Sequence, residues 1–289
     1  MHSNLKRLGT AKRGCQVVGI ARSTYYYKLM SKKPPDIDLA EVIEKIALDY
    51  PYYGYRRITA ELHRQGLKVN HKKVFRLMRD KNLLCRARKA FKATTDSSHC
   101  LVKYPNLIED LVPYRTDQIW HADITYIRIA NSFVYLATLI DGFSRKVVGY
   151  GLGKTLSADL AIAALIDAIS KRNTDNLIHH SDQGIQYCSY DYVKILKDYG
   201  IAISMSGKAN PYENAKIESF FRTLKVEEIY MFDYGTYEEV LNRIPYFIEE
   251  VYNKKRLHSS LGYMPPEEFE NINNKNMKGN ESHQLILNS

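Results

Sequence analysis

The sequence contains little cysteine and no long apolar run. Its four cysteines are widely spaced, without the close pairing of a zinc knuckle, and its nine histidines include no His-x-x-x-His pair. The longest apolar stretch, residues 160–169, is interrupted by Asp167, whereas a membrane-spanning helix needs about 20 apolar residues. These absences exclude a disulfide scaffold, a cysteine-rich zinc knuckle and a membrane span. They predict a soluble, reduced, cytoplasmic chain with no membrane partner.

Acidic residues are scarce in the first third of the chain. Residues 1–103 hold 23 Lys and Arg against 8 Asp and Glu, whereas residues 104–289 hold 19 against 24, so the net charge of +10 arises entirely at the front. A basic block is typical of a polyanion binder, because each phosphate that it neutralises releases condensed counterions. The alternative is a basic face that only solubilises the protein.

Three short amphipathic helices are predicted in this basic part, over residues 38–50, 55–66 and 70–83. Asn70 is suited to cap the third helix. Residues 1–85 are therefore predicted to be a small all-helical DNA-binding region. The side chains predicted to contact DNA from it are Arg56, Arg57, Lys72, Lys73 and Arg76.

Strand patterns begin near residue 118, with three β-rich runs separated by short turns, over residues 118–130, 132–141 and 145–153. Helices and strands then alternate: a helix at 157–171, a strand at 176–182, a helix at 189–199, a strand at 201–205, a long helix from about 210 and a closing helix at 236–253. Parallel strands need crossover connections that cover both faces of a sheet. The order therefore predicts an α/β fold, a ribonuclease-H-like mixed sheet with flanking helices.

Domain boundaries follow from the same patterns. Residues 86–114 have little periodicity and are predicted to be a linker, residues 115–272 the catalytic core, and residues 273–289 a polar tail.

Two aspartates lie at informative places in the predicted sheet. Asp123 falls in the first strand, on the same side as His121 and Thr125, and a lone Asp there is costly to bury unless it is paired or binds a cation. Asp182 ends the fourth strand, where α/β sheets place ligands. The alternative for Asp182 is a turn-forming residue.

The long helix carries a third acidic candidate, Glu218. At about 100° per residue, Glu218 lies at the rim of the helix, close to Arg222 and Lys225. The alternative is an ordinary helix salt bridge with Arg222. The predicted core stripe of this helix comprises Ile217, Phe220, Phe221 and Leu224.

Taken together, Asp123, Asp182 and Glu218 predict a catalytic metal site. Hard oxygen ligands from separate elements can hold two Mg²⁺ ions about 3.5–4 Å apart, with Mn²⁺ as a substitute, for phosphodiester chemistry. Arg222 and Lys225 are predicted to hold the DNA backbone over this site. Further predicted backbone contacts, with solvated surface as the alternative, are Lys208, Lys254, Arg256 and His258.

Two other glutamates compete with Glu218. Glu227 lies about 180° around a continuous helix from it, which would separate the two. Glu213 is predicted to cap the helix start, at the third position of a helix with Asn210 as N-cap and Pro211 as the first residue. Only Glu218 is therefore predicted to be catalytic. His179 and His180 could position phosphate or water, or could be structural.

Several segments resemble a known family: "WHADITYI", "LIDGFSRKVVGYGL", "HHSDQGIQY", "SMSGKANPYENAKIESFFRTLKVEE" and "YNKKRLHSSLGYMPPEEF". They are similar to the integrase-type core of bacterial insertion-sequence transposases encoded in two overlapping reading frames. The similarity covers about residues 115–270 and puts Asp123, Asp182 and Glu218 at the family's DDE positions, with 35 residues between the last two. Residues 50–84 resemble the family's upstream DNA-binding segment.

The resemblance implies a transposase that cuts double-stranded DNA at the element ends and joins the freed 3′-OH to target DNA. It also implies a homo-oligomer on paired ends in the bacterial cytoplasm, associated with the nucleoid. A full helix-turn-helix and a leucine zipper would come from the first-reading-frame product or a fusion to it. Two alternatives stay open, a metal-dependent nuclease without strand transfer and a non-catalytic DNA-binding relic of a transposon.

Overall fold

The computed structural model describes residues 11–19, 21, 38–85, 101–207 and 214–275. The helices described at the front of the chain are α2 (Ala11–Val18), α4 (Leu39–Asp49), α5 (Tyr55–Arg64) and α6 (His71–Asp80).

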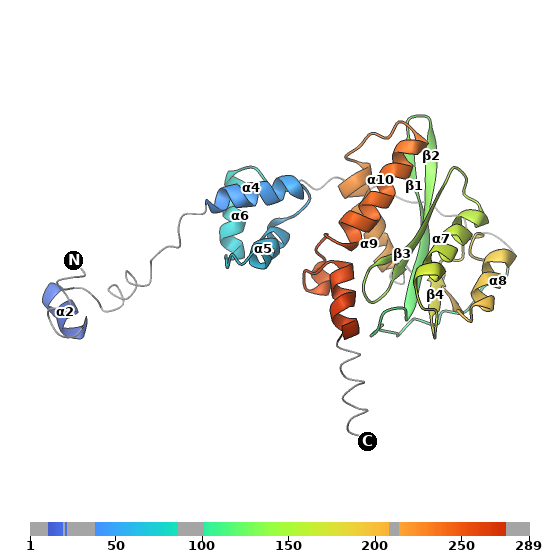
Figure 1. The fold of residues 1–289 in the computed structure, drawn as a ribbon, viewed down its shortest axis with the longest axis horizontal. Coiled ribbons are helices and arrows are strands. Elements are labelled where there is room, and N and C mark those ends of the chain that lie inside the picture. Colours follow the sequence, from blue (N-terminus) through green and yellow to red (C-terminus); the bar gives the residue numbers. More distant parts are fainter. Residues whose placement is uncertain (1–10, 20, 22–37, 86–100, 208–213, 276–289) are drawn as a thin grey trace, which may run out of the picture.

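Helices α4, α5 and α6 form a small helical unit with its own apolar core (Figure 1). Side chains from all three helices are buried together, among them Ile43, Ile58, Leu62 and Met78. The Asn70 side chain accepts a hydrogen bond from the Lys72 backbone N–H at 2.8 Å, which confirms the predicted cap of α6.

The second unit is built on a five-stranded sheet of order β3-β2-β1-β4-β5. Its strands are β1 (Ile119–Ile129), β2 (Ser132–Asp141), β3 (Val147–Gly153), β4 (Ile178–Ser181) and β5 (Ala202–Met205). The first three strands are antiparallel, whereas β4 and β5 are parallel to β1. This topology confirms the predicted ribonuclease-H-like mixed sheet.

Helices cover both faces of the sheet (Figure 1). Ala137 and Leu139 of β2 pack with α7 (Ala158–Lys171) and α8 (Tyr190–Asp198) on one face. Leu136 and Ile140 pack with the helices on the other, because successive strand residues point to opposite faces. The helical segments on this second face are α9 (Ala215–Leu224), α10 (Tyr237–Tyr246), and the π-helical turns η2 (Lys225–Ile229) and η3 (Phe247–Asn253).

A glycine in β3 allows α7 to approach the sheet closely. A Cβ atom built on Gly149 would lie 2.4 Å from the Ala164 carbonyl oxygen, which is closer than two such atoms can approach. The backbones of α7 and β3 therefore meet where no side chain intervenes.

Part of the predicted linker belongs to the sheet unit. The Met205 N–H donates to the Pro105 carbonyl at 3.3 Å, and the Leu107 N–H donates to Ser204 Oγ at 2.9 Å. Residues 104–108 of the predicted linker thus pack beside β5. Residues 86–100 lie outside the described part of the chain.

The last described segment extends past the predicted end of the core. After the 3-10 turn η4 (Ser259–Leu261), a helix occupies residues 266–275. Its Glu270 is buried against the sheet unit, where it accepts hydrogen bonds from Arg172.

The helical unit contacts this C-terminal segment. Arg64 donates two hydrogen bonds to Glu268, at 3.0 and 2.6 Å, and the Leu257 N–H donates to the Tyr53 hydroxyl at 2.9 Å. Leu257 is buried in the apolar core of the helical unit. Within the described ranges, no helix is both long enough and apolar enough to cross a membrane.

Candidate active site

Asp123 and Asp182 follow paired residues on neighbouring strands. Ala122 of β1 pairs with Ser181 of β4 in parallel register, and the two aspartates are the next residue of each chain segment. Neighbouring strands lie about 4.8 Å apart, so this register brings the two aspartates side by side.

Backbone N–H groups hold both aspartate side chains. Asp123 Oδ1 accepts from the Ile124 N–H at 2.7 Å, and Asp182 Oδ1 accepts from the Gly184 N–H at 2.9 Å. A Cβ atom on Gly184 would lie 2.8 Å from that same oxygen, so a larger residue there would push the Asp182 carboxylate out of this position. The predicted turn role of Asp182 and its predicted site role are therefore compatible.

Glu218 approaches the aspartates from the helix above the sheet. Helix α9 packs against β1 and β2, and its stripe of Ile217, Phe220, Phe221 and Leu224 is buried, as predicted. Strand alternation places Asp123 on the sheet face that α9 covers, the face of Ile127. Glu218 lies in the first turn of α9 with its side chain exposed.

The electrostatics of Asp123 reflect this convergence. The pKa of Asp123 is raised to about 7, mainly by burial and in addition by the charges of Asp182 and Glu218, whereas the Ile124 N–H and Lys225 oppose the shift. Both other carboxylates are therefore close enough to act on Asp123. Asp123, Asp182 and Glu218 are called the carboxylate trio below.

Among the described cations, Lys225 lies close enough to Asp123 for the two charges to interact. Burial lowers its pKa, whereas the charge of Asp123 raises it. The Lys225 ammonium lies 5.3 Å from the centre of the Tyr126 ring, a cation–π distance. Arg222, one turn from Glu218, is exposed.

The donor chemistry of the trio fits a divalent cation, although its atoms are not gathered into a ready-made cage. Among the described residues, no group of three His, Cys, Asp or Glu side chains lies close enough to hold a metal ion as it stands. Carboxylate oxygens are nevertheless the ligands that Mg²⁺ prefers, and a cation would relieve the repulsion felt by Asp123.

Sequence reasoning missed Tyr187. Its side chain is buried, and its hydroxyl has no hydrogen-bond partner in the part of the chain that the structure describes. Burial raises its pKa well above the ordinary value, and the charges of Asp123 and Asp182 add to the shift. Only its place five residues after Asp182 separates Tyr187 from the other tyrosines of the sequence, and that is a weak signal.

The paired histidines of β4 are structural. His179 Nε2 lies 2.8 Å from the Tyr192 hydroxyl, and His180 Nδ1 lies 2.9 Å from Ser204 Oγ. Burial lowers the pKa of His179 to about 3 and that of His180 to about 4, so both rings are neutral near pH 7. Of the two alternatives for these residues, the geometry favours the structural one.

The described part of α9 begins at Ala215, with Asn214 as its N-cap. The predicted start at Pro211, with Asn210 as cap and Glu213 as a capping residue, falls on residues that the structure does not describe, and it stays a prediction. Residues 208–213, which include Lys208 and Glu213, lie outside the described part of the chain.

Glu227 is neutralised by arginine. Arg256 donates to both Glu227 oxygens, at 2.8 and 2.7 Å, and an Arg57 nitrogen lies 3.9 Å from Glu227 Oε1. The segment is also not a continuous α-helix, because η2 widens it into a π-helix at Lys225. These ion pairs give Glu227 a structural role. The prediction from the sequence rested instead on its angular separation from Glu218 around a continuous helix.

Two predicted DNA contacts are wrong in this arrangement. Arg256 is 5% exposed beside Glu227, and His258 is 8% exposed, with its pKa lowered by burial to about 2. A side chain buried in this way cannot reach a phosphate. Arg57 is half-buried against Glu227, and Lys254 is exposed but bonded to Glu250 at 2.6 Å. The predicted contacts that are exposed without such a bond are Arg56, Lys72, Lys73, Arg76 and Arg222.

Family models match most of the chain. An Integrase core domain matches residues 113–211, a second Integrase core domain model matches residues 199–266, and an HTH-like domain matches residues 35–91. The last match means that this chain has a helix-turn-helix-like unit of its own. This match agrees with the predicted helical DNA-binding region, and the full helix-turn-helix and leucine zipper expected from the first-reading-frame product stay a prediction.

Individual relatives cover similar ranges. The Insertion element IS600 uncharacterized 31 kDa protein of Shigella sonnei is 36% identical over 88% of this chain and 96% of its own length. Transposase InsF for insertion sequence IS3A of Escherichia coli is 40% identical over 76% of this chain and 77% of its own. Among solved structures, the HTLV-2 integrase catalytic core domain in complex with magnesium aligns with a TM-score of 0.43 at 16% identity, over 54% of this chain and 97% of that one.

Proposed function

Because the chain belongs to the insertion-sequence transposases that carry an integrase core domain, we propose that it cuts DNA at the ends of its element and joins the freed 3′-OH to target DNA. The observation that supports this most is the convergence of Asp123 and Asp182, side by side on β1 and β4, with Glu218 on α9. Three separate elements contribute one carboxylate each, which suits metal-assisted phosphodiester chemistry better than acid/base chemistry.

Asp123, Asp182 and Glu218 would hold two Mg²⁺ ions, with Mn²⁺ as a substitute. When bound, such ions activate the attacking oxygen and stabilise the leaving oxygen of a phosphodiester. The protein's own part is to hold the carboxylates in place. The Ile124 and Gly184 N–H groups fix the two aspartates, and the buried stripe of α9 fixes the helix that carries Glu218.

Cationic side chains beside the trio would position the DNA backbone. Lys225 is held over the Tyr126 ring and faces Asp123, and Arg222 extends into solvent from the turn after Glu218. The partners that this function requires are double-stranded DNA, from element ends and target, and further copies of the chain on paired ends. The first-reading-frame product would add recognition domains. The site of action would be the bacterial nucleoid.

The test is cleavage and joining of labelled duplexes that carry the DNA flanking its gene, with Mg²⁺, with Mn²⁺ and with excess chelator. Asp123→Asn, Asp182→Asn and Glu218→Gln are each expected to lose detectable cleavage and joining, because each removes a carboxylate ligand. Glu227→Gln is the matched control on the same helical segment. It is expected to keep most of the activity, because Gln can still accept a hydrogen bond from Arg256.

The same assay separates the alternatives. Cleavage without joined product would favour a nuclease, and binding without any metal-dependent cleavage would favour a non-catalytic relic. An active Glu218→Gln variant beside an inactive Glu227→Gln variant would overturn the assignment. Glu213→Gln is expected to retain most of its activity, as a further check on which glutamate is catalytic.

A further inference from the structure

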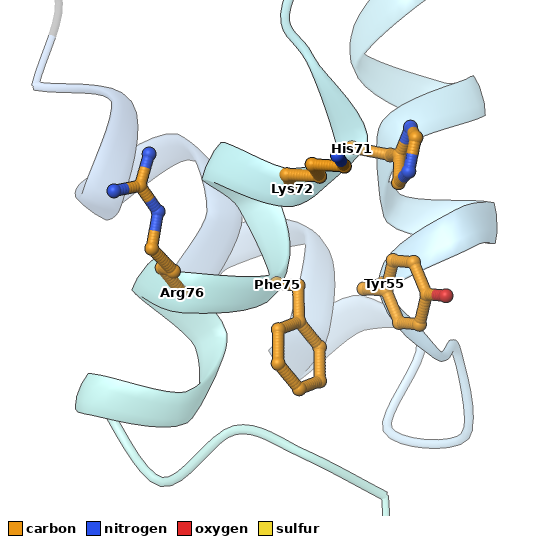
Figure 2. A pocket seen from close by; sticks show the side chains of 5 residues that line it. All are labelled: Tyr55, His71, Lys72, Phe75 and Arg76. Carbon is orange, nitrogen blue, oxygen red and sulfur yellow. The ribbon is translucent and has the colours of Figure 1, made fainter.

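An open hollow of about 400 Å³ lies on the helical unit, and no member of the carboxylate trio lines it. Figure 2 shows the side chains that do. Tyr55 at the start of α5 lines one side of it, and residues from the first half of α6 line the rest. The lining residues are Tyr55, His71, Lys72, Phe75 and Arg76.

The aromatic wall of the hollow is held by ring contacts. Phe75 meets the Tyr55 ring edge-on, with ring centres 5.2 Å apart, and His71 lies 6.2 Å from Tyr55 in a near-parallel orientation. The Arg56 guanidinium lies 5.2 Å from the centre of the Tyr55 ring. Tyr55 is therefore engaged by its neighbours, whereas Phe75, 38% exposed, presents free apolar surface beside it.

Packing within the helical unit does not require Phe75. The buried side of α6 is supplied by Val74 and Met78, which are fully buried among the residues of α4 and α5. The opposite face of α6 is exposed. Helical spacing places four residues on it: His71, Lys72, Phe75 and Arg76. An apolar ring that stays exposed inside a cationic rim is typical of a recognition surface rather than a core.

The charge of α6 identifies the class of ligand. This helix carries Lys72, Lys73, Arg76 and Arg79 against a single acidic residue, Asp80. Such a face complements the phosphates of a polyanion. The region that matches an HTH-like domain holds α4, α5 and α6, so α6 is its third helix and the second of the consecutive pair α5 and α6. In helix-turn-helix motifs the N-terminal residues of the second helix of such a pair reach base edges in the major groove.

We propose that the Phe75 ring, backed by Tyr55, contacts the C5-methyl group of thymine in the major groove, while Lys72 and Arg76 contact the flanking phosphates. In the major groove the methyl group is the apolar feature that marks thymine, and a Phe side chain can read it. The hollow would thus make the helical unit sensitive to thymine position. This inference rests on the proposed action on double-stranded DNA and adds a specificity-determining residue to it.

The test is equilibrium binding of the full chain, in chelator, to three probes. Two are DNA duplexes of about 20 base pairs, which is two helical turns. One alternates A and T, and the other alternates A and deoxyuridine, so that it lacks only the methyl groups of thymine. The third is single-stranded oligo-dT. The wild-type chain is expected to bind the A/T duplex about fourfold more tightly than the A/U duplex, the effect of burying one methyl group.

Variants assign that preference to a residue. Phe75→Ala is expected to bind both duplexes equally, and Phe75→Leu to keep part of the preference, with thermal melts to verify folding. Tyr55→Phe is the matched control that keeps the ring wall, and it should retain the fourfold difference. Arg76→Ala is expected to weaken both duplexes alike and to reduce the slope of log affinity against log salt by about one.

Three results would overturn the proposal: equal wild-type binding to both duplexes, a methyl preference that survives in Phe75→Ala, or a Phe75 effect confined to oligo-dT. The last would identify a surface for stacking unpaired bases instead. Binding in chelator is independent of catalysis. A chain that shows the Phe75-dependent preference but never joins DNA would refute the proposed reaction and keep this subsite. A chain that joins DNA without that preference would refute the subsite and keep the reaction.

Discussion

Two groups of acidic side chains in the sheet unit differ in how far their negative charges are compensated. The first, called the neutralised cluster here, comprises Asp117, Asp141 and Glu270 around Arg172. The second is the carboxylate trio. Each group includes an aspartate whose pKa is raised mainly by burial, to about 6 for the fully buried Asp141 and to about 7 for Asp123, which keeps some solvent exposure in the middle of β1.

The neutralised cluster has a donor for each carboxylate. Arg172 donates to Asp117 at 2.8 Å and to both oxygens of Glu270 at 2.8 and 2.9 Å. Asp141 accepts from the Asp117 N–H, from the Phe143 and Ser144 N–H groups, and from the Ser144 hydroxyl. Although burial alone would raise the pKa of Glu270, the hydrogen bond and charge of Arg172 hold it below the ordinary value.

Two members of the trio, Asp123 and Glu218, lack this compensation. Within the described residues, neither forms a salt bridge, and the Asp123 carboxylate accepts its hydrogen bond from the Ile124 N–H. Buried acids that serve the fold are saturated with donors. Acids that are left with mutual repulsion are candidates for function, because the missing positive charge can come from a ligand.

The largest effect is expected from Arg172→Met. It would leave Asp117 without its cation and the buried Glu270 with only Lys146, at 3.6 Å, which should lower the free energy of unfolding by about 3–5 kcal/mol. Chemical denaturation would measure this. The neighbouring Lys171→Met is the control, because Lys171 pairs with Asp167 on the surface and its loss should cost less than about 1 kcal/mol. Equal effects of both variants would remove the basis of the comparison.

Replacement of Asp141 and of Asp123 by asparagine should change the free energy of unfolding in opposite directions. Asp141→Asn presents an NH₂ group to donors and is expected to lower the free energy of unfolding by about 1–3 kcal/mol. Asp123→Asn removes a repelled charge and is expected to raise it by about 1 kcal/mol in metal-free protein, the usual gain when a functional site is relieved. Denaturation in chelator near pH 8 measures both. Destabilisation by Asp123→Asn comparable to that by Asp141→Asn would show that the trio is also part of the folding framework.

The smallest effects are expected at two tyrosine hydroxyls. Tyr192→Phe loses the hydrogen bond to His179 and should destabilise by about 1 kcal/mol, whereas Tyr187→Phe removes a hydroxyl without a described partner and should be neutral or slightly stabilising. Thermal melts of the two variants give the comparison directly. A clear loss of stability in Tyr187→Phe would mean that the Tyr187 hydroxyl is hydrogen-bonded in solution. The lack of compensating partners near the trio would then not include Tyr187.

Local patterns in the sequence determined much of this protein. Alternation in β1 is enough to place Asp123 on one face of the sheet, and helical spacing is enough to make Ile217, Phe220, Phe221 and Leu224 the buried stripe of α9. These inferences succeed because the geometry of a strand or helix repeats over a few residues. The order of elements likewise led to the mixed sheet, since crossovers restrict how parallel strands can be connected.

Only the tertiary structure decided which charges are compensated. Arg256 and Glu227 are 29 residues apart, and Arg172 and Glu270 are 98 apart, yet each pair is bonded at under 3 Å. The sequence therefore predicted Arg256 as a DNA contact, whereas the fold buries it. Glu227 likewise differs from Glu218 because it has arginine partners. A sequence pattern specifies the face on which a side chain lies, but an ion pair depends on distances of a few ångströms, which are set when all the elements pack together.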